Sequence, residues 1–271
     1  MTDRSSPIGI FDSGIGGLTV LKEIFTALPA ENTIYLGDTA RVPYGIRSPE
    51  TVTRYSFENT RFLSSRQIKL LVIACNTASS VSLDAVRESF PVPVVGVIEP
   101  GAKAAAAATR NRKVGVIGTE ATVKSNSYPK AIRSVDSSVE VFSVPCPLFV
   151  PIVEEGWTEG MITEMVAERY LADIRAKGID TLVLGCTHYP LLKAILSKVM
   201  GSGVRLIDSA VETAREIRSI LLSSSLLNES AGTVRHEFYV TDAPQKFLSV
   251  GERFLGRKIA HIEQTKLEME V

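Results

Sequence analysis

Two cysteines stand in matching places along the chain. Cys75 and Cys186 each follow an apolar, strand-like run and precede polar residues that open a helix, in LVIACNTASS and LVLGCTHYPL. The N–H groups at a helix start favour negative charge and lower a thiol pKa. The pair therefore predicts two reactive thiols that act on one small substrate. Cys146, which stands between prolines in VPCPLF, lacks this setting and is assigned to packing.

Hydrogen-bonding residues follow both cysteines. Asn76 and Thr77 follow the first, and Thr187 and His188 follow the second. Their amides, hydroxyls and backbone N–H groups are suited to holding carboxylates, although Asn and Thr also serve as ordinary helix caps. Because His188 lies two residues after a cysteine, we interpret it as a proton partner of that thiol.

A glycine-rich loop, DSGIGG at 12–17, follows the first strand-like run. It lacks the GxGxxG spacing of dinucleotide-binding loops, and the acid at its start would repel a pyrophosphate. We therefore expect the glycines to let backbone approach a small ligand. Asp12 would orient or deprotonate a neighbouring group.

Two further segments have the composition of binding loops. GDTARVPYG at 37–45 follows the second strand-like run, and a proline-punctuated loop at 145–151 precedes Glu154 and Glu155. An ordinary turn and a solvated helix start are the alternative interpretations.

Short β-branched runs alternate with segments of helical period, which predicts an α/β fold. Several runs are apolar at successive positions, as in parallel strands buried on both faces. The predicted strands are 8–11, 33–36, 70–74, 94–98, 113–117, 139–143, 181–185, 205–207 and 237–240. The predicted helices are 17–28, 49–65, 78–89, 100–108, 121–134, 160–176, 190–200 and 210–223.

The two cysteine segments resemble one another and lie about one domain length apart. We therefore expect two similar doubly wound α/β domains with mainly parallel sheets and an active site in the cleft between them. The first domain would be discontinuous, comprising 1–97 and 209–271, and the second would comprise 98–208.

The composition excludes several functional classes. The 30 basic residues equal the 30 acidic ones, so no charge excess points to nucleic acid or an acidic membrane surface. No apolar run is long enough to span a bilayer, and MTDRSSP shows no signal-peptide pattern. Three cysteines without a CxxC motif favour a reducing cytoplasm over disulfides or zinc.

Taken together, these segments closely resemble the glutamate racemases of the aspartate/glutamate racemase family. The resemblance runs from about residue 8 to 214. It rests on IGIFDSGIGGLTV, YLGDTARVPYG, LLVIACNTAS, VVGVIEP, VGVIGTEATV, CPLFVPIVEEG, LVLGCTHYPLL and LIDSA, in this order.

The resemblance implies interconversion of L- and D-glutamate without pyridoxal phosphate (PLP), other cofactor or metal, which supplies D-glutamate for peptidoglycan, the cell wall and cell shape. It implies Cys75 and Cys186 as the two proton-transfer bases, aided by Asp12 and His188 respectively. Glu154 would stand near Cys186, with Glu155 left open for that role. The implied substrate-binding residues are Asp12, Ser13, Tyr44, Gly45, Asn76, Thr77, Thr119, Thr122, Thr187 and His188. A cytoplasmic homodimer is expected.

Three alternatives stay open. An aspartate racemase, or a related decarboxylase or isomerase, would share the chemistry; the Thr187-His188 pair and the DSGIGG loop favour glutamate. A Cys–His hydrolase or amidase needs one nucleophilic thiolate only, so the second cysteine counts against it. A two-lobed binding protein of periplasmic type would need neither thiol.

Overall fold

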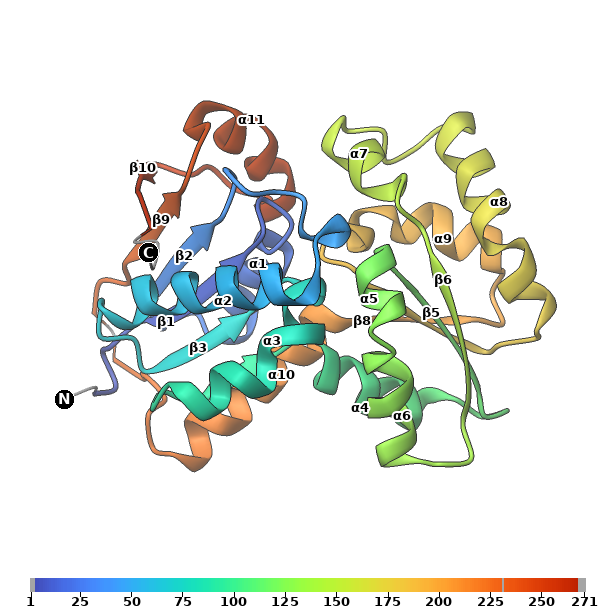
Figure 1. Cartoon of the computed structure of the whole chain (residues 1–271), viewed down its shortest axis with the longest axis horizontal. Coiled ribbons are helices and arrows are strands. Elements are labelled where there is room, and N and C mark those ends of the chain that lie inside the picture. Colours follow the sequence, from blue (N-terminus) through green and yellow to red (C-terminus); the bar gives the residue numbers. More distant parts are fainter. Residues whose placement is uncertain (1–2, 231, 268–271) are drawn as a thin grey trace.

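The described residues, 3–230 and 232–267 of a computed structural model, form two parallel β-sheets in two lobes that lie side by side (Figure 1). The first sheet has the order β10-β9-β2-β1-β3-β4 and the second β6-β5-β7-β8. The strands of the first are β1 (Ile8–Asp12), β2 (Thr33–Gly37), β3 (Leu70–Ile73), β4 (Val94–Gly96), β9 (His236–Val240) and β10 (Glu263–Gln264). Those of the second are β5 (Lys113–Gly118), β6 (Glu140–Pro145), β7 (Thr181–Gly185) and β8 (Arg205–Asp208).

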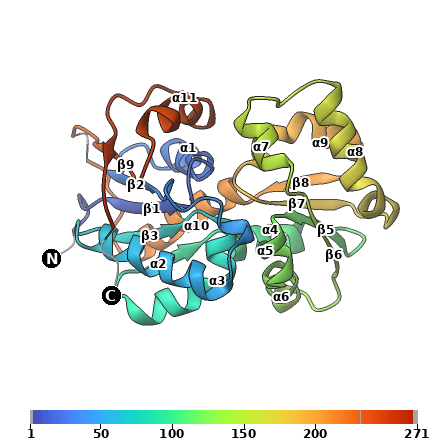
Figure 2. The same cartoon turned by 45° about the horizontal axis from the view of Figure 1, so that its top comes forward.

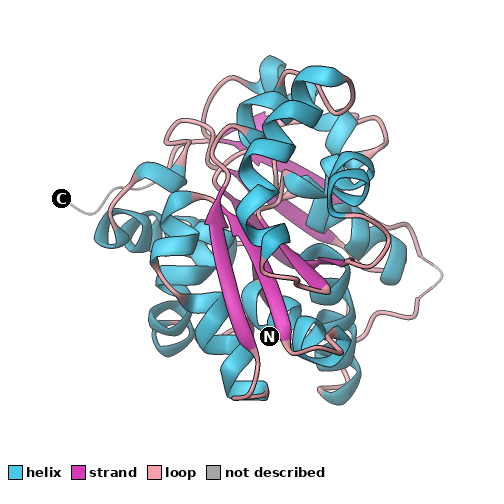
Figure 3. Cartoon of the chain, turned by 90° about the vertical axis from the view of Figure 1, so that its right-hand side faces the viewer, coloured by secondary structure: helices cyan, strands magenta, loops and turns pink. Residues whose placement is uncertain are grey.

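Helices cover the sheets on both sides (Figure 3). They are α1 (Leu18–Ala27), α2 (Pro49–Ser64), α3 (Asn76–Ser89), α4 (Ile98–Ala108), α5 (Glu120–Lys124), α6 (Ser127–Val135), α7 (Phe149–Glu154), α8 (Met161–Ala176), α9 (Lys193–Met200), α10 (Ser209–Ser223) and α11 (Pro244–Leu255), with 3-10 turns η1 (Tyr44–Ile46) and η2 (Tyr189–Leu192). None of the helices in these described ranges combines the length and apolar character needed to cross a bilayer.

Burial on both faces explains why the strands are continuous apolar runs. In β1, Ile10 belongs to the hydrophobic cluster that includes α1, whereas Phe11 belongs to the cluster that includes α2 and α3. In β7, Val183 packs in a third cluster with α4 and α6, whereas Leu184 packs in the same cluster as Ile10. Successive side chains of a strand point to opposite faces, so each residue needs an apolar neighbour. The predicted doubly wound α/β fold with parallel sheets is confirmed.

The first sheet takes its strands from both ends of the chain, and the second takes its strands from 113–208. Helices α4 and α10 pack against one another where the lobes join. The domain boundaries at 97/98 and 208/209 stay a prediction, and residues 1–2 and 268–271 of the predicted first domain lie outside the described residues.

Several predicted elements differ from the structure in their bounds, and three of these differences are the most informative. The strand expected at 94–98 ends at Gly96, since Ile98 begins α4. The helix expected at 121–134 is two helices, because Asn126 has a left-handed φ of 58° that interrupts the turn. The helix expected at 190–200 begins as the 3-10 turn η2 before α9. The sequence analysis also missed α7, α11 and β10.

Candidate active site

One cavity of about 180 Å³ contains both cysteines of the predicted pair. It lies where strands end, since Ser13 follows β1, Cys75 follows β3 and Cys186 follows β7. Helix α3 of the first lobe and α5 of the second meet beside it (Figures 1 and 2). The lining residues are Ser13, Val42, Pro43, Tyr44, Gly45, Ile46, Cys75, Asn76, Thr77, Thr119, Glu120, Pro147, Val150, Pro151, Cys186, Thr187 and His188. Ligands of parallel α/β sheets bind at such strand ends.

Cys75 caps the N-terminus of α3. Its sulfur lies 3.5 Å from the backbone N of Ala78 and 3.7 Å from Oγ of Ser13. Burial, and after it the negative charge of Asp12, nevertheless raise the pKa of Cys75 to about 12. The backbone N–H of Ala78 at the helix start does lower this pKa, as predicted, but desolvation outweighs it, so the net shift is upward.

Cys186 has a different partner. Its sulfur lies 3.8 Å from Nδ1 of His188, and Nε2 of that ring lies 3.1 Å from Oε1 of Glu154. Burial opposes a charged imidazole, but the hydrogen bonds with Cys186 and Glu154 raise the pKa of His188 to about 10. An imidazolium therefore stands beside Cys186 at neutral pH. Of the two acids left open by the sequence, Glu154 makes this contact, while Glu155 caps the end of α7.

Asp12 ends β1 and lies behind the cavity wall rather than in it. Its Oδ2 accepts a 2.9 Å hydrogen bond from the backbone N of Gly14, and its buried Oδ1 has no hydrogen-bond partner within the described residues. Burial raises the pKa of Asp12, and the charge of His188 acts in the opposite direction. Asp12 acts on Cys75 through its negative charge, which raises the pKa of that thiol.

Three hydroxyls join the two lobes at the cavity. Oγ1 of Thr77 lies 2.9 Å from Oγ1 of Thr119 and 3.3 Å from Oγ1 of Thr122, and the last two lie 2.9 Å apart. Thr77 is in the first turn of α3, and Thr119 caps α5. Thr122 does not line the cavity, but its hydroxyl bonds to those of Thr77 and Thr119, which do.

Asn76 carries a free donor at the cavity. Its Oδ1 accepts a 2.8 Å hydrogen bond from the hydroxyl of Tyr128, but its buried Nδ2 has no partner among the described residues. Because an unpaired buried donor is costly, this amide is suited to an acceptor that a ligand brings.

The glycine-rich loop supports the segment after Cys186. Oγ1 of Thr19 donates a 2.9 Å hydrogen bond to the carbonyl of Thr187. A Cβ added to Gly16 would lie 2.2 Å from Oγ1 of Thr187 and 2.6 Å from Cε1 of His188. Glycine is thus required here for a close approach between the lobes.

The structure brings most of the predicted residues to one place. Ser13, Tyr44, Gly45, Asn76, Thr77, Thr119, Thr187, His188 and both cysteines line the cavity, and Asp12, Thr122 and Glu154 lie behind it. The sequence analysis did not assign Val42, Pro43, Ile46, Glu120, Pro147, Val150 or Pro151. All but Ile46 and Glu120 fall in the two segments singled out as binding loops, so the signal was regional rather than residue by residue.

Comparisons with known proteins agree on one family. Residues 8–217 match the family described as Asp/Glu/Hydantoin racemase. A glutamate racemase of Geobacter metallireducens is 57% identical over 263 residues, which is 97% of each chain. The crystal structure of a glutamate racemase isoform of Bacillus anthracis has a TM-score of 0.95 and 41% identity, and covers 98% of this chain and 100% of its own.

The glutamate racemase of Francisella tularensis, solved in complex with D-glutamate, has a TM-score of 0.92 and 42% identity over 98% of this chain and 99% of its own. The similarity therefore extends past residue 214, where the sequence analysis found little.

Proposed function

The chain belongs to the Asp/Glu/Hydantoin racemase family, and on that basis we propose that it is a glutamate racemase that interconverts L- and D-glutamate by two-base proton transfer at the α-carbon. The observation that carries this proposal is that Cys75 of the first lobe and Cys186 of the second line one cavity of about 180 Å³. Glutamate is proposed as the substrate because the proteins that resemble almost the whole chain are glutamate racemases.

Racemisation removes the α-hydrogen from one face of the substrate and adds a hydrogen to the other. One thiolate takes the proton, so that a C–H bond breaks and an S–H bond forms, and the opposite thiol gives its proton to the resulting carbanion. A single fixed base would tend to return the proton to the face it left. Positioned acid–base groups contribute roughly 10²–10⁴-fold each.

The two thiols have different surroundings. The raised pKa of Cys75, about 12, keeps it protonated at neutral pH. The imidazolium of His188, 3.8 Å from the sulfur of Cys186, stabilises negative charge there, and Glu154 holds the ring in place. Cys75 is thus set up as an acid, and His188 with Glu154 is placed to support negative charge on Cys186 when that thiol acts as the base.

Donors around the cavity support carboxylate binding. The free Nδ2 of Asn76 and the hydroxyls of Thr77 and Thr119 belong to residues that line the same cavity as the two thiols. In a site closed from water, such donors stabilise the charge that develops when the α-carbon is deprotonated. Ser13, Tyr44, Gly45, Thr187 and His188 complete the proposed set, with Asp12 and Thr122 behind it.

The wider role follows from the same reaction. Since the chain's own residues supply both bases and the binding donors, the proposed reaction uses neither PLP nor a metal. Its product, D-glutamate, would enter peptidoglycan synthesis in the cytoplasm. A homodimer stays a prediction, which sedimentation equilibrium of the purified protein tests.

The decisive experiment replaces each cysteine separately. We expect Cys75→Ala and Cys186→Ala each to lower racemisation at least about 10²-fold in both directions, since each removes one positioned acid–base group. Circular dichroism follows the racemisation of L- and D-glutamate without added PLP or metal. Aspartate is assayed separately as the alternative substrate.

Cys146→Ala is the matched control. This thiol is buried near the carbonyl of Val144 and does not line the cavity, so racemisation should stay within about twofold, since the variant removes no acid–base group. Normal racemisation by both cavity variants would disprove the two-thiol mechanism, and faster turnover of aspartate would change the substrate.

A further inference from the structure

One wall of the cavity is a single loop. All five residues from 42 to 46 line the cavity, and they follow β2 and run into η1. In Figures 1 and 2 this segment, in blue between β2 and α2, reaches towards α5 of the second lobe. Of the five, Tyr44 alone is buried, and Ile46 is 74% exposed. The loop therefore has little apolar packing of its own to hold it.

Tyr44 is anchored by a buried polar network that the proposed mechanism does not use. Its hydroxyl donates to Oδ2 of Asp38 and accepts a 3.0 Å hydrogen bond from Nδ2 of Asn59. Asp38 also accepts a 3.0 Å hydrogen bond from the hydroxyl of Thr241. Since the tyrosine hydroxyl donates one hydrogen bond and accepts another within this network, the hydroxyl holds the loop and leaves the ring as cavity wall.

Arg41 stands at the centre of the network. Its Nε lies 2.7 Å from Oδ2 of Asp38, its Nη1 pairs with Glu58, and its guanidinium lies 4.0 Å from the ring centre of Tyr55. The side chains of Asp38 and Glu58 are 0% and 3% exposed. Two buried carboxylates need a cation to balance them, and the planar fork of arginine bonds several acceptors in fixed directions.

We propose that Arg41 is a positioning residue for the active site: with Asp38, Glu58 and Asn59 it fixes Tyr44, and through Tyr44 the 42–46 wall, in the place that binds glutamate. None of these four lines the cavity, so they touch no substrate. The kinetic test of this inference rests on the proposed function, because it measures racemisation. The hydrogen-exchange test depends only on the loop.

The kinetic test uses Arg41→Met, which keeps the length of the side chain. We expect KM to rise about tenfold or more for both enantiomers with kcat changed less than about threefold, since a displaced wall weakens binding in the ground state and transition state alike. Arg41→Lys should recover part of the loss. Arg54→Met is the matched control, because Arg54 is exposed and lies 5.4 Å from the same Tyr55 ring without reaching Asp38.

A double variant tests whether Arg41 acts through Tyr44. Tyr44→Phe keeps the ring and cuts the bonds to Asp38 and Asn59, so it should raise KM in the same way even if Arg41→Met folds poorly. Adding Arg41→Met to it should raise KM no further, because residues in one network are not additive. A purely additive rise in KM, or a loss in kcat alone, overturns the proposal.

Hydrogen exchange of the unliganded protein gives a readout that does not depend on activity. In Arg41→Met, amides of the peptide covering 40–48 should exchange at least about tenfold faster while peptides of α3 and β7 stay protected, as expected of local opening. Unchanged exchange in this peptide overturns the proposal whatever the activity. Faster exchange in a protein that does not racemise glutamate would instead remove the proposed function and leave the positioning role intact.

Discussion

The two cavity cysteines follow equivalent strands but meet different neighbours. Burial raises the pKa of Cys75, and the negative charge of the buried Asp12 raises it further. Cys186 lies beside His188, whose own partner is Glu154. The position of each thiol after a strand thus places it at the cavity, whereas the neighbouring charges determine which form of the thiol they favour.

Asp12 is costly to the fold, which gives a prediction. Because burial raises its pKa, the charged form is penalised in the folded state, and the penalty appears as the pH rises above the ordinary value of 3.8. Asp12→Asn should therefore raise the free energy of unfolding at pH 8, by about 1–2 kcal/mol, because a neutral amide costs less to bury than an unpaired charge. It should also slow racemisation.

Urea unfolding at pH 8, 6 and 4 checks the sign. The gain of the variant over the natural protein should shrink as the pH falls towards 4, close to the ordinary pKa of 3.8, where the unfolded chain also begins to bind the proton. A gain that is the same at every pH would mean that charge is not its cause.

At the scale of elements, the loop after β1 acts as a support for the segment after β7. The added Cβ in Gly16→Ala would meet Thr187 and His188 at 2.2 and 2.6 Å, so these side chains must shift, and His188 is the partner of Cys186. We expect racemisation to fall about tenfold or more, as for other small displacements of catalytic groups, with unfolding changed by about 1 kcal/mol.

Gly14→Ala in the same loop is the control. Its Cβ would meet the nearest atom, a methyl of Val42, at 3.4 Å, which is an ordinary contact. If both variants lost racemisation equally, any side chain in this loop would be harmful regardless of its contact with Thr187 and His188. That result would remove the supporting role assigned to Gly16.

The elements that the sequence revealed are those with strong apolar periods. The strands were found because both faces of each sheet are covered, so their residues are apolar in succession. Helix α7 was missed because Pro151 suggested a loop, although proline is tolerated in a first helical turn. Helix α11 did carry a signal, with Pro244 at its start and buried Phe247, Val250 and Phe254 at helical spacing.

What the sequence did not reveal are contacts that only the fold creates. The bond between His188 and Glu154 joins the residue before η2 to α7, and the ring of Phe254 from α11 packs on His188 at 5.2 Å between ring centres. The network of Arg41 and Glu58 joins a loop to the following helix. Motif spacing identified the cavity thiols, but the charge around them depends on these contacts across elements.

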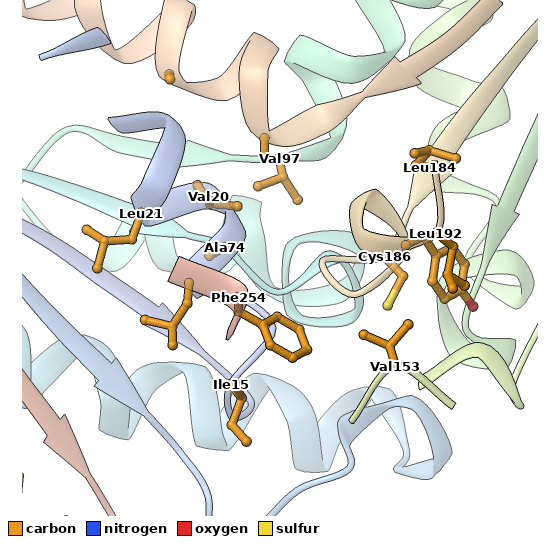
Figure 4. Close-up of a cluster of buried hydrophobic side chains, with 14 of the residues drawn as sticks. Ile15, Val20, Leu21, Ala74, Val97, Val153, Leu184, Cys186, Leu192 and Phe254 are labelled. Atoms are coloured by element: carbon orange, nitrogen blue, oxygen red, sulfur yellow. The ribbon is translucent and has the colours of Figure 1, made fainter. Parts of the chain in front are cut away.

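At the scale of the whole molecule, the lobes share one hydrophobic cluster. Ile15 and Phe254 of the first lobe belong to the same cluster as Val153 and Cys186 of the second (Figure 4). The cavity adds a second, polar junction, formed by the hydroxyls of Thr77 and Thr119. A substrate bound there contacts both lobes, so binding should stabilise the molecule as a unit.

We therefore expect glutamate to raise the melting temperature of the whole chain in one transition. At about 100 times Kd, binding adds about 2.7 kcal/mol to stability, and for a chain of this size each kcal/mol raises Tm by roughly 2–4 °C. The measurement needs Cys75→Ala, because an active racemase would mix the enantiomers during the scan. In that variant L- and D-glutamate should each raise Tm by about 5–10 °C.

Acetate at the same concentration should raise Tm by much less, since it carries one carboxylate and cannot contact both lobes together. If acetate stabilised the protein as well as glutamate does, the cavity would be a general anion site. If glutamate split the melting curve into two transitions, it would be binding one lobe only, and the two thiols would not be acting on a single carbon.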